Sequence, residues 1–280
     1  MKTIAVTGSS GFIGKHLLNV LKGVYKSVIE LDIDKGFNLL LKKDVRRVPK
    51  FDVIIHLAAK SFVPQSFKIP WEYYLQNYTL TLNVLELARK NHAKVVFFSS
   101  YLYGTPDYLP INETHPIKPH NPYAQSKLIC EKLCEGYNRD FNVPVIIYRP
   151  FNIYGPGQNS SFLIPNIIEQ LKTGEILLKD PRPKRDFIYV TDVVKAVINA
   201  IEYDKTNFEL FNLGYGKSYS VNEIVSTIQE VSRIRARVTF SNEVRQGEVL
   251  ETVADISKLF AVFNWMPTTD FKEGIKKILS

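Results

Sequence analysis

The stretch Lys2–Gly14, with the sequence KTIAVTGSSGFIG, decides the fold. Its apolar run IAV predicts a short buried strand, and the residues after the last glycine have the apolar spacing of a helix. Gly8 permits a tight turn, Gly11 lets the backbone approach a pyrophosphate, and Gly14 lets the helix pack close to the strand. The helix N-terminus adds free N–H groups and a partial positive charge. This order predicts a dinucleotide site, with a plain turn before a helix as the alternative.

The composition is that of an ordinary globular protein. The 280 residues are 45% hydrophobic and 23% charged, which allows a substantial core in one large domain or two joined ones. No segment approaches the ~20 apolar residues that span a bilayer. The first residues lead straight into the predicted strand, without the features of a signal peptide. We therefore expect a cytoplasmic protein with no membrane partner.

Charge and ligand-type residues narrow the partners. The net charge is +8, but Lys and Arg are scattered, so we expect no nucleic-acid partner. The excess suits a small anionic substrate such as a nucleotide diphosphate. Cys130 and Cys134 lie four apart in one predicted helix, and the five histidines form no cluster. We expect free thiols and no metal site.

Strands and helices alternate from the N-terminus to Arg149, which predicts an α/β fold: a Rossmann-type, doubly wound parallel sheet with helices on both faces. After the first strand, the apolar patterns predict strands at 27–32, 52–59, 94–100 and 143–149, and helices at 11–21, 71–91 and 123–140.

The alternation ends in a proline- and glycine-rich loop at 150–157, and 180–186 is predicted as a basic loop. Further helices are predicted at 162–172, 193–201, 220–232, 255–260 and 271–279, and strands at 175–178 and 208–213. We expect a dinucleotide-binding domain at 1–149, completed by about 186–213. Residues 150–185 and 214–280 form a smaller C-terminal α/β part that binds substrate.

An acid ends the second predicted strand. Asp32 follows Gly14 by 18 residues, where a dinucleotide fold places the carboxylate that accepts hydrogen bonds from the adenosine ribose. This carboxylate would repel a 2′-phosphate, so NAD is favoured as cofactor, while Lys35 leaves NADP open. A solvated aspartate is the alternative. The further candidate cofactor contacts, at the first helical turn, the adenine side and the third strand end, are Phe12, Ile13, Asp44, Val45, Leu57, Ala58, Ala59 and Asn77.

The segment Tyr123-Ala-Gln-Ser-Lys127 carries the predicted chemistry. Residues four apart share one helix face, so the Lys127 ammonium can lower the pKa of the Tyr123 phenol from its usual value of ~10. The phenol is then a general acid or base for carbinol–carbonyl interconversion, and the lysine can also hold the nicotinamide ribose. Ser99 or Ser100, at the end of the preceding strand, supplies a hydroxyl for the substrate oxygen.

Six motifs in order, G-x-x-G-x-x-G, HLAA, SSYLYG, Y-x-x-x-K, RPFNIYGPG and KRDFIYVTD, resemble the extended short-chain dehydrogenase/reductases, in their nucleotide-sugar epimerase/dehydratase branch. The resemblance covers essentially the whole chain. It implies that Ser99, four residues before Tyr103, is the catalytic hydroxyl beside Tyr123 and Lys127. It also implies a homodimer that pairs the helices predicted at 71–91 and 123–140.

The resemblance also implies contacts to a nucleotide-diphosphate sugar. Asn152 matches an asparagine that touches the sugar diphosphate, and Arg185 and Arg245 match arginines that clamp the diphosphate or nucleotide. For both arginines a surface ion pair is the alternative. Lys60 and Ser100 are further candidate substrate contacts.

One departure from the family pattern narrows the reaction. The 4,6-dehydratases of this branch have Asp-Glu after the catalytic threonine, and the decarboxylases have a glutamate there, whereas this chain has Ser100 and Tyr101. Dehydration and decarboxylation, which need an extra acid and base, are therefore disfavoured. We expect a nucleotide-sugar 4-epimerase, with an NAD(P)H-dependent 4-keto-(6-deoxy)sugar nucleotide reductase as the alternative. A catalytically inactive dinucleotide-binding protein is a third, remote reading.

Overall fold

The computed structural model describes residues 2–204, 208–244 and 248–280. The chain forms two compact units. Unit 1 comprises 1–102, 117–150 and 194–211, and unit 2 comprises 103–116, 151–193 and 212–280. Sequence patterns assigned 103–116 to the first domain. In the structure this stretch bonds within unit 2, because the Tyr103 hydroxyl donates to Asn212 Oδ1 at 2.6 Å and the Ile111 amide donates to the Val253 carbonyl.

Unit 1 is built on a sheet of strands in the order β2-β1-β3-β4-β5-β9. The strands are β1 Thr3–Thr7, β2 Ser27–Leu31, β3 Val53–His56, β4 Lys94–Phe98, β5 Val145–Pro150 and β9 Phe208–Leu213. The pairings β1–β2, β1–β3, β3–β4 and β4–β5 are parallel. The Rossmann-type prediction is therefore confirmed. Strand order reverses at β1, and ligands of such sheets bind where the carboxyl ends meet this reversal.

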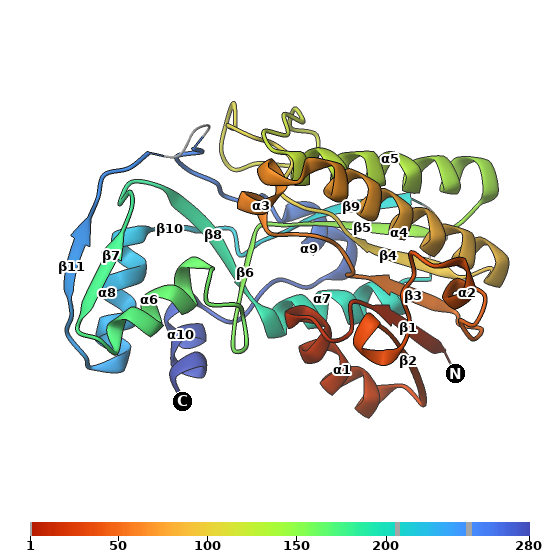
Figure 1. Cartoon of the computed structure of the whole chain (residues 1–280), viewed down its shortest axis with the longest axis horizontal. Helices are drawn as coiled ribbons and strands as arrows, with labels where there is room; N and C mark the ends of the chain where they lie inside the picture. Colours follow the sequence, from red (N-terminus) through yellow and green to blue (C-terminus); the bar gives the residue numbers. More distant parts are fainter. Residues whose placement is uncertain (1, 205–207, 245–247) are drawn as a thin grey trace. The chain divides into compact units, whose positions relative to one another are not determined.

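Helices cover both faces of this sheet (Figure 1). Helices α4 (Pro70–Asn91) and α5 (Pro122–Phe141) run side by side along one face, and α1 (Phe12–Val24) and α7 (Val190–Glu202) lie on the other. Proline at the start of α4 and α5 suits the first helical turn, and the Asn121 side chain caps α5 by accepting the Ala124 amide at 2.8 Å. Short helical turns η1 (Ile33–Lys35), α2 (Lys42–Val45) and α3 (Val63–Lys68) fill the connections.

Unit 2 holds two small sheets, β10-β8-β6 and β11-β7. Its core surrounds Tyr154 and Phe271, whose ring centroids lie 5.3 Å apart. The elements are β6 Asn152–Tyr154, β7 Glu175–Leu178, β8 Lys184–Tyr189, β10 Ser218–Ser220, β11 Arg237–Phe240, α6 Leu163–Leu171, α8 Val221–Ser232, α9 Ser257–Phe263 and α10 Phe271–Leu279. Strands β6 and β8 lie where loops were predicted, because these two short segments pair with each other across about 30 residues of chain, and local composition does not reveal such pairing.

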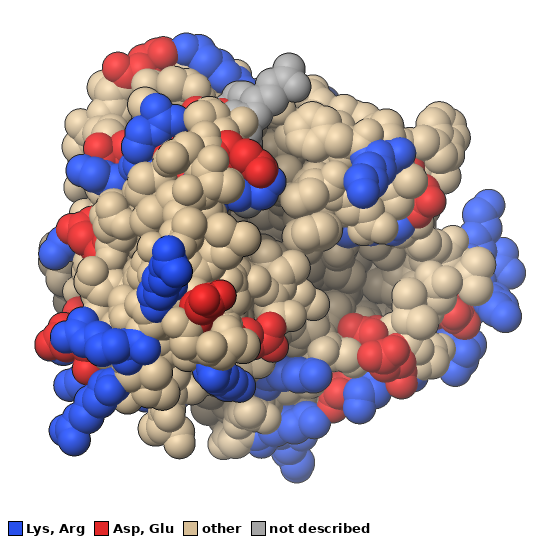
Figure 2. Space-filling model, turned by 60° about the vertical axis from the view of Figure 1, so that its left-hand side comes forward, with Lys and Arg blue, Asp and Glu red and all other residues tan. Residues whose placement is uncertain are grey.

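Positive and negative side chains are mixed on the face shown in Figure 2. On the face in Figure 2, Lys and Arg side chains alternate with Asp and Glu rather than gathering into one continuous basic area. Within the described ranges, no helix has both the length and the apolar composition for crossing a membrane.

Candidate active site

The glycine turn after β1 is packed against the end of β3. Gly8 has a φ of 68°, and a Cβ added there would lie 2.8 Å from the Ala58 amide nitrogen. A Cβ on Gly14 would lie 2.3 Å from the Gly8 carbonyl oxygen, which real structures do not tolerate. At Gly11 the nearest atom would be the same carbonyl at 3.2 Å. Packing therefore requires glycine at the first and third positions, whereas the middle position is exposed and its amide donates to the Gly8 carbonyl at 3.1 Å.

The acid after β2 is tied to this turn. One Asp32 carboxylate oxygen accepts the Ser10 amide at 3.0 Å, and the other accepts the Asp34 amide at 3.2 Å. Ser9, in the glycine turn next to Ser10, is fully buried, and among the described residues its Oγ has no hydrogen-bond partner. A carboxylate oxygen has more than one lone pair, so Asp32 can still accept ribose hydroxyls. The turn, the orphaned Ser9 hydroxyl and Asp32 together fit a dinucleotide.

The positive charge nearest in sequence to Asp32 is already engaged. The Lys35 ammonium lies 3.4 Å from Glu30, which also pairs with Lys22 at 2.6 Å. Hydrogen bonding to Lys22 holds the pKa of Glu30 below its ordinary value. Lys35 is therefore already paired, and a 2′-phosphate would meet the Asp32 carboxylate.

The remaining candidate cofactor contacts differ in whether they bond to polar groups or pack against apolar ones. Asp44 is buried, accepts the Asn38 amide at 3.0 Å and pairs with Arg47 at 3.1 Å, so its carboxylate shapes the loop after β2. Val45 packs on the core of unit 1. Phe12 and Ile13 begin α1, and Leu57–Ala59 follow β3, with the Ala58 amide donating to Thr7 Oγ1 at 3.1 Å. All of these contacts remain predictions.

The predicted catalytic pair lies at the start of α5. Lys127 is 3% exposed, with its ammonium 4.2 Å from the centre of the Phe97 ring. Tyr123 lies one turn earlier, in edge-on contact with Tyr73 at 6.5 Å between ring centroids. The Ser100 hydroxyl and the Tyr123 phenol share a hydrogen bond. Hydroxyl, phenol and ammonium thus come from the end of β4 and the first turns of α5.

The pKa of the Tyr123 phenol is raised in this structure, whereas the sequence predicted that Lys127 lowers it. Burial raises the pKa of Tyr123 to about 12, although the hydrogen bond with Ser100 opposes the rise. Burial also lowers the pKa of Lys127 from its ordinary value. Desolvation disfavours the charged form of each group.

The two serines after β4 differ in their surroundings, and their predicted roles remain predictions. Ser99 is 3% exposed, and its Oγ has no partner among the residues described. Ser100, expected to face the substrate, is the one that contacts the Tyr123 phenol.

Lys60 and Asn77 both have protein partners. The Lys60 ammonium pairs with Glu72 and lies 5.9 Å from the Tyr73 ring centre. Asn77 is 2% exposed; its Oδ1 accepts the Lys60 amide at 2.8 Å, and its Nδ2 donates to the Lys60 carbonyl and to Ser126 Oγ. The Asn77 amide is thus engaged within the protein rather than solvated.

Unit 2 holds the predicted substrate residues. Asn152 Nδ2 donates to the Asp186 carbonyl at 3.1 Å. The Arg185 guanidinium pairs with Glu248 and donates to the Lys184 carbonyl at 2.9 Å, so the ion-pair alternative is realised in this structure. Arg245 lies outside the described residues.

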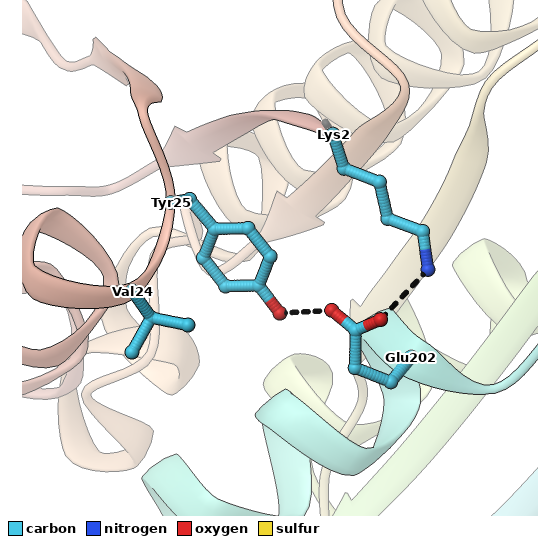
Figure 3. A pocket seen from close by; sticks show the side chains of 4 residues that line it. All are labelled: Lys2, Val24, Tyr25 and Glu202. Carbon is cyan, nitrogen blue, oxygen red and sulfur yellow. Dashed lines mark hydrogen bonds and ion pairs between the residues drawn. The ribbon is translucent and has the colours of Figure 1, made fainter.

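Two other types of site were sought. The described residues contain no group of three or more His, Cys, Asp or Glu side chains placed to hold a metal ion. A pocket of about 410 Å³ lies near the amino end of β1, lined by Lys2, Val24, Tyr25 and Glu202 (Figure 3). Its polar groups bond to one another, Tyr25 and Lys2 both to Glu202. This cluster braces the end of α7.

Sequence reasoning missed the polar residues beneath the site. His56, Thr81 and Ser126 are each at most 2% exposed. His56 Nε2 hydrogen-bonds with Thr81 Oγ1, and Ser126 Oγ accepts a hydrogen bond from Asn77 Nδ2. Thr81 follows Asn77 by one helical turn, and Ser126 lies within the Tyr123–Lys127 motif. Polar residues at helical spacing on a buried face were the available signal.

Fold and site combine a Rossmann-type sheet, a glycine turn that fits a dinucleotide, and a tyrosine and a lysine one turn apart on α5. The chain belongs to the NAD-dependent epimerase/dehydratase family, whose model matches residues 4–214. It is therefore an NAD(P)-dependent enzyme, and the family resemblance noted in the sequence is confirmed.

Relatives of both expected activities are found. A Methanocaldococcus jannaschii protein provisionally named UDP-glucose 4-epimerase is 33% identical, over 99% of this chain and 97% of its own. The GDP-6-deoxy-D-mannose reductase of Pseudomonas aeruginosa is 28% identical, over 98% and 95%. Among solved structures, MoeE5 with UDP-glucuronic acid and NAD has a TM-score of 0.91 at 29% identity, covering 99% and 97%. RMD from Pseudomonas aeruginosa with NADPH reaches 0.91 at 27% identity, covering 100% and 98%.

Proposed function

We propose that this protein is a nucleotide-sugar 4-epimerase that uses NAD and a Ser/Tyr/Lys proton shuttle. The observation that carries the proposal is the contact of the Ser100 hydroxyl with the Tyr123 phenol, one turn before the buried Lys127, at a strand end without a carboxylate. Such a site can move one proton but lacks the second acid and base that dehydration requires. Relatives named as UDP-glucose 4-epimerases support the choice.

NAD would lie across the carboxyl ends of β1, β2 and β3. The glycine turn and the N-terminus of α1 would hold the pyrophosphate, Asp32 the adenosine ribose, and Lys127 the nicotinamide ribose. NAD supplies a hydride acceptor at the sugar C4. Orphaned hydroxyls at Ser9 and Ser99 add two polar atoms that a bound ligand would satisfy.

The chain's own groups manage the C4 proton. Tyr123 takes the proton of the C4 hydroxyl as hydride leaves C4, and it returns the proton when hydride comes back to the opposite face of the 4-keto sugar. We assign the hydroxyl beside the phenol to Ser100, and expect Ser99, sequence-matched to that role, to contact the substrate oxygen or the cofactor. Asn152 and Arg185 in unit 2 are the proposed diphosphate contacts, with Arg185 exchanging Glu248 for phosphate oxygens.

Reduction of a 4-keto sugar nucleotide is the second candidate, because a GDP-6-deoxy-D-mannose reductase is among the relatives. Protein purified with bound NAD that interconverts UDP-glucose and UDP-galactose without added cofactor would support epimerisation. Net oxidation of NADH or NADPH by a 4-keto-6-deoxy sugar nucleotide, with no epimerisation, would overturn it. Since the nucleotide is not determined by these residues, the assay is preceded by thermal-shift screening of UDP, dTDP, GDP and CDP.

Tyr123→Phe tests the shuttle. We expect kcat to fall at least about 100-fold, as for loss of a general acid–base group, with the melting temperature little changed. Tyr137→Phe is the matched control, because it removes a hydroxyl from the same helix, where Tyr137 bonds Glu86 at 2.9 Å, 14 residues from the site. Equal activity of the two variants would refute the role of Tyr123.

We also propose a homodimer through α4 and α5. Trp71, Leu75 and Tyr78 lie along α4 and are 74%, 49% and 40% exposed, and Ile129 on α5 is 36% exposed. Apolar side chains at this helical spacing are typical of a helix-pairing surface. Trp71→Glu combined with Leu75→Lys should give a monomer by light scattering, while an unchanged mass would contradict the assignment. A cytoplasmic location remains a prediction.

A further inference from the structure

The residues beneath the site form one continuous polar network. The Ala58 amide donates to Thr7 Oγ1 at 3.1 Å, and Thr7 Oγ1 lies 2.8 Å from His56 Nδ1. On the other side of the ring, His56 Nε2 lies 3.1 Å from Thr81 Oγ1. The Thr81 hydroxyl donates to the Asn77 carbonyl at 2.8 Å. The imidazole therefore joins the strand end that faces the cofactor site to helix α4.

The network continues from α4 to the catalytic helix. Asn77 Nδ2 donates to Ser126 Oγ at 2.9 Å, and Ser126 Oγ donates to the Tyr123 carbonyl at 2.7 Å. The same Asn77 amide clamps the backbone of Lys60 by its amide and its carbonyl, at 2.8 and 3.1 Å. One side chain thus holds both the segment after β3 and the first turn of α5.

The hydrogen atoms can be assigned along the whole network. The Asn77 carbonyl accepts both the Thr81 hydroxyl and, at 3.3 Å, the Cys130 thiol, so we assign the Thr81 oxygen as the acceptor of His56 Nε2–H. His56 Nδ1 is then bare and accepts from Thr7, whose oxygen accepts the Ala58 amide. All donors and acceptors are satisfied by a neutral imidazole in the Nε2–H form. Burial and the nearby Lys127 lower the pKa of His56 to about 3, in agreement.

We propose that His56, Thr81, Asn77 and Ser126 are positioning residues, which fix the distance and orientation between the cofactor-facing segment after β3 and the Tyr123–Lys127 turn. Each of the four is at most 2% exposed, so a broken link would leave a buried polar group unsatisfied and the two segments free to shift. The neighbouring groups that face the imidazole are the Phe97 ring, at 5.6 Å between centroids, and the Lys127 ammonium. A neutral imidazole leaves Lys127 as the cation of the turn.

The proposal rests on the proposed function for its kinetic test, which uses whichever sugar nucleotide the enzyme turns over. Thr81→Val removes the central hydroxyl at nearly constant shape. Because ~1 Å of misplacement at a catalytic group can cost about 100-fold in rate, we expect kcat per NAD-loaded site to fall about 10- to 100-fold, with the substrate KM nearly unchanged. The control, Thr79→Val, makes the same chemical change on the same helix at a half-buried position and should leave kcat unaltered.

Two further variants separate positioning from general stability. His56→Gln keeps an N–H donor near the Nε2 position and should retain more of kcat than His56→Phe, which removes both ring nitrogens. The effects of Thr81→Val and Ser126→Ala on kcat should be less than additive, since both cut one network. Rates are measured well below each variant's melting temperature. Full additivity, or a Thr81→Val variant that equals Thr79→Val in kcat, would overturn the proposal.

The imidazole can also be tested without any turnover. Long-range ¹H–¹⁵N NMR of histidine-labelled protein has five side-chain signals to distinguish, and the His56 signal is the one lost in His56→Gln. We expect the Nε2–H form, with no titration between pH 5 and pH 9. The Nδ1–H form or a titrating ring would refute the network. Failure of the epimerase assay with this signal intact would instead refute the proposed function alone.

Discussion

Gly14→Ala is the sharpest test of the cofactor cradle. The new Cβ would lie 2.3 Å from the Gly8 carbonyl oxygen and 2.7 Å from the Ser9 carbonyl oxygen. Both neighbours are backbone atoms of the turn itself, so no side chain can swing aside. Reaching an ordinary contact requires a movement of about 1 Å in a closely packed region. The turn that should bind the pyrophosphate must therefore deform.

The expected effect on NAD binding is large. Charge-assisted hydrogen bonds of the kind made by a phosphate to backbone N–H groups contribute about 1.5–3 kcal/mol each. Losing one would raise the NAD dissociation constant about 10- to 100-fold. Overpacking should also destabilise the apo protein by about 1–3 kcal/mol, offset in part by the better helix propensity of alanine, worth about 1 kcal/mol.

Gly23→Ala is the matched control on the same helix. Nothing lies within 4 Å of a Cβ there, so the change should stabilise α1 by up to about 1 kcal/mol and leave NAD binding unaltered. Isothermal titration with NAD and thermal unfolding compare the two variants. Wild-type affinity in Gly14→Ala would refute the reasoning that the turn holds the pyrophosphate.

Three further perturbations follow from the packing. Gly274→Ala places Cβ 2.0 Å from the Tyr154 phenol oxygen, so thermal unfolding should show a loss of about 1–3 kcal/mol, and an unchanged melting temperature would mean that the phenol moves freely. Arg149→Met strands the buried carboxylate of Glu131, bonded at 2.9 and 2.6 Å, and should cost about 3–5 kcal/mol in urea titrations; the double variant with Glu131→Leu should recover most of it. Burial raises the pKa of Asp186 to about 6 from 3.8, so the stability from this group is present below about pH 4 and lost as pH rises through 6. The melting temperature of Asp186→Asn relative to wild type should therefore rise between pH 4 and pH 7, and a flat difference would contradict the assignment.

Elements with strong local signals could be predicted closely. Strands β7 and β9 and helix α10 begin and end at the predicted residues, because apolar alternation, helical spacing and the Asp270 cap are all local in sequence. Strands β6 and β8 could not be predicted, since each is short and depends on a partner remote in the chain. Patterns within a segment say nothing about that partner.

At the site, too, features set by local sequence could be predicted, and features that depend on remote residues could not. The glycine turn and the Tyr123–Lys127 spacing are local, and the structure places them where the sequence predicts. The pKa of Tyr123 was expected to fall and instead rises to about 12, because burial outweighs the hydrogen bond with Ser100, and local spacing does not predict burial. Sequence patterns identify groups able to titrate, whereas the surrounding dielectric sets the direction.

Hydrogen bonds within the protein distinguish the predicted ligand contacts from one another. Asp32, Lys60 and Asn77 each have protein partners, and their roles toward a cofactor or substrate remain predictions. Ser9 and Ser99 are the opposite case: both are buried, and both hydroxyls lack a partner among the residues described. They follow β1 and β4, two strands of one parallel sheet whose carboxyl ends lie along the same edge. Leaving a buried hydroxyl unsatisfied costs about 1–3 kcal/mol, so an elongated polar ligand along this edge would recover that cost at both places.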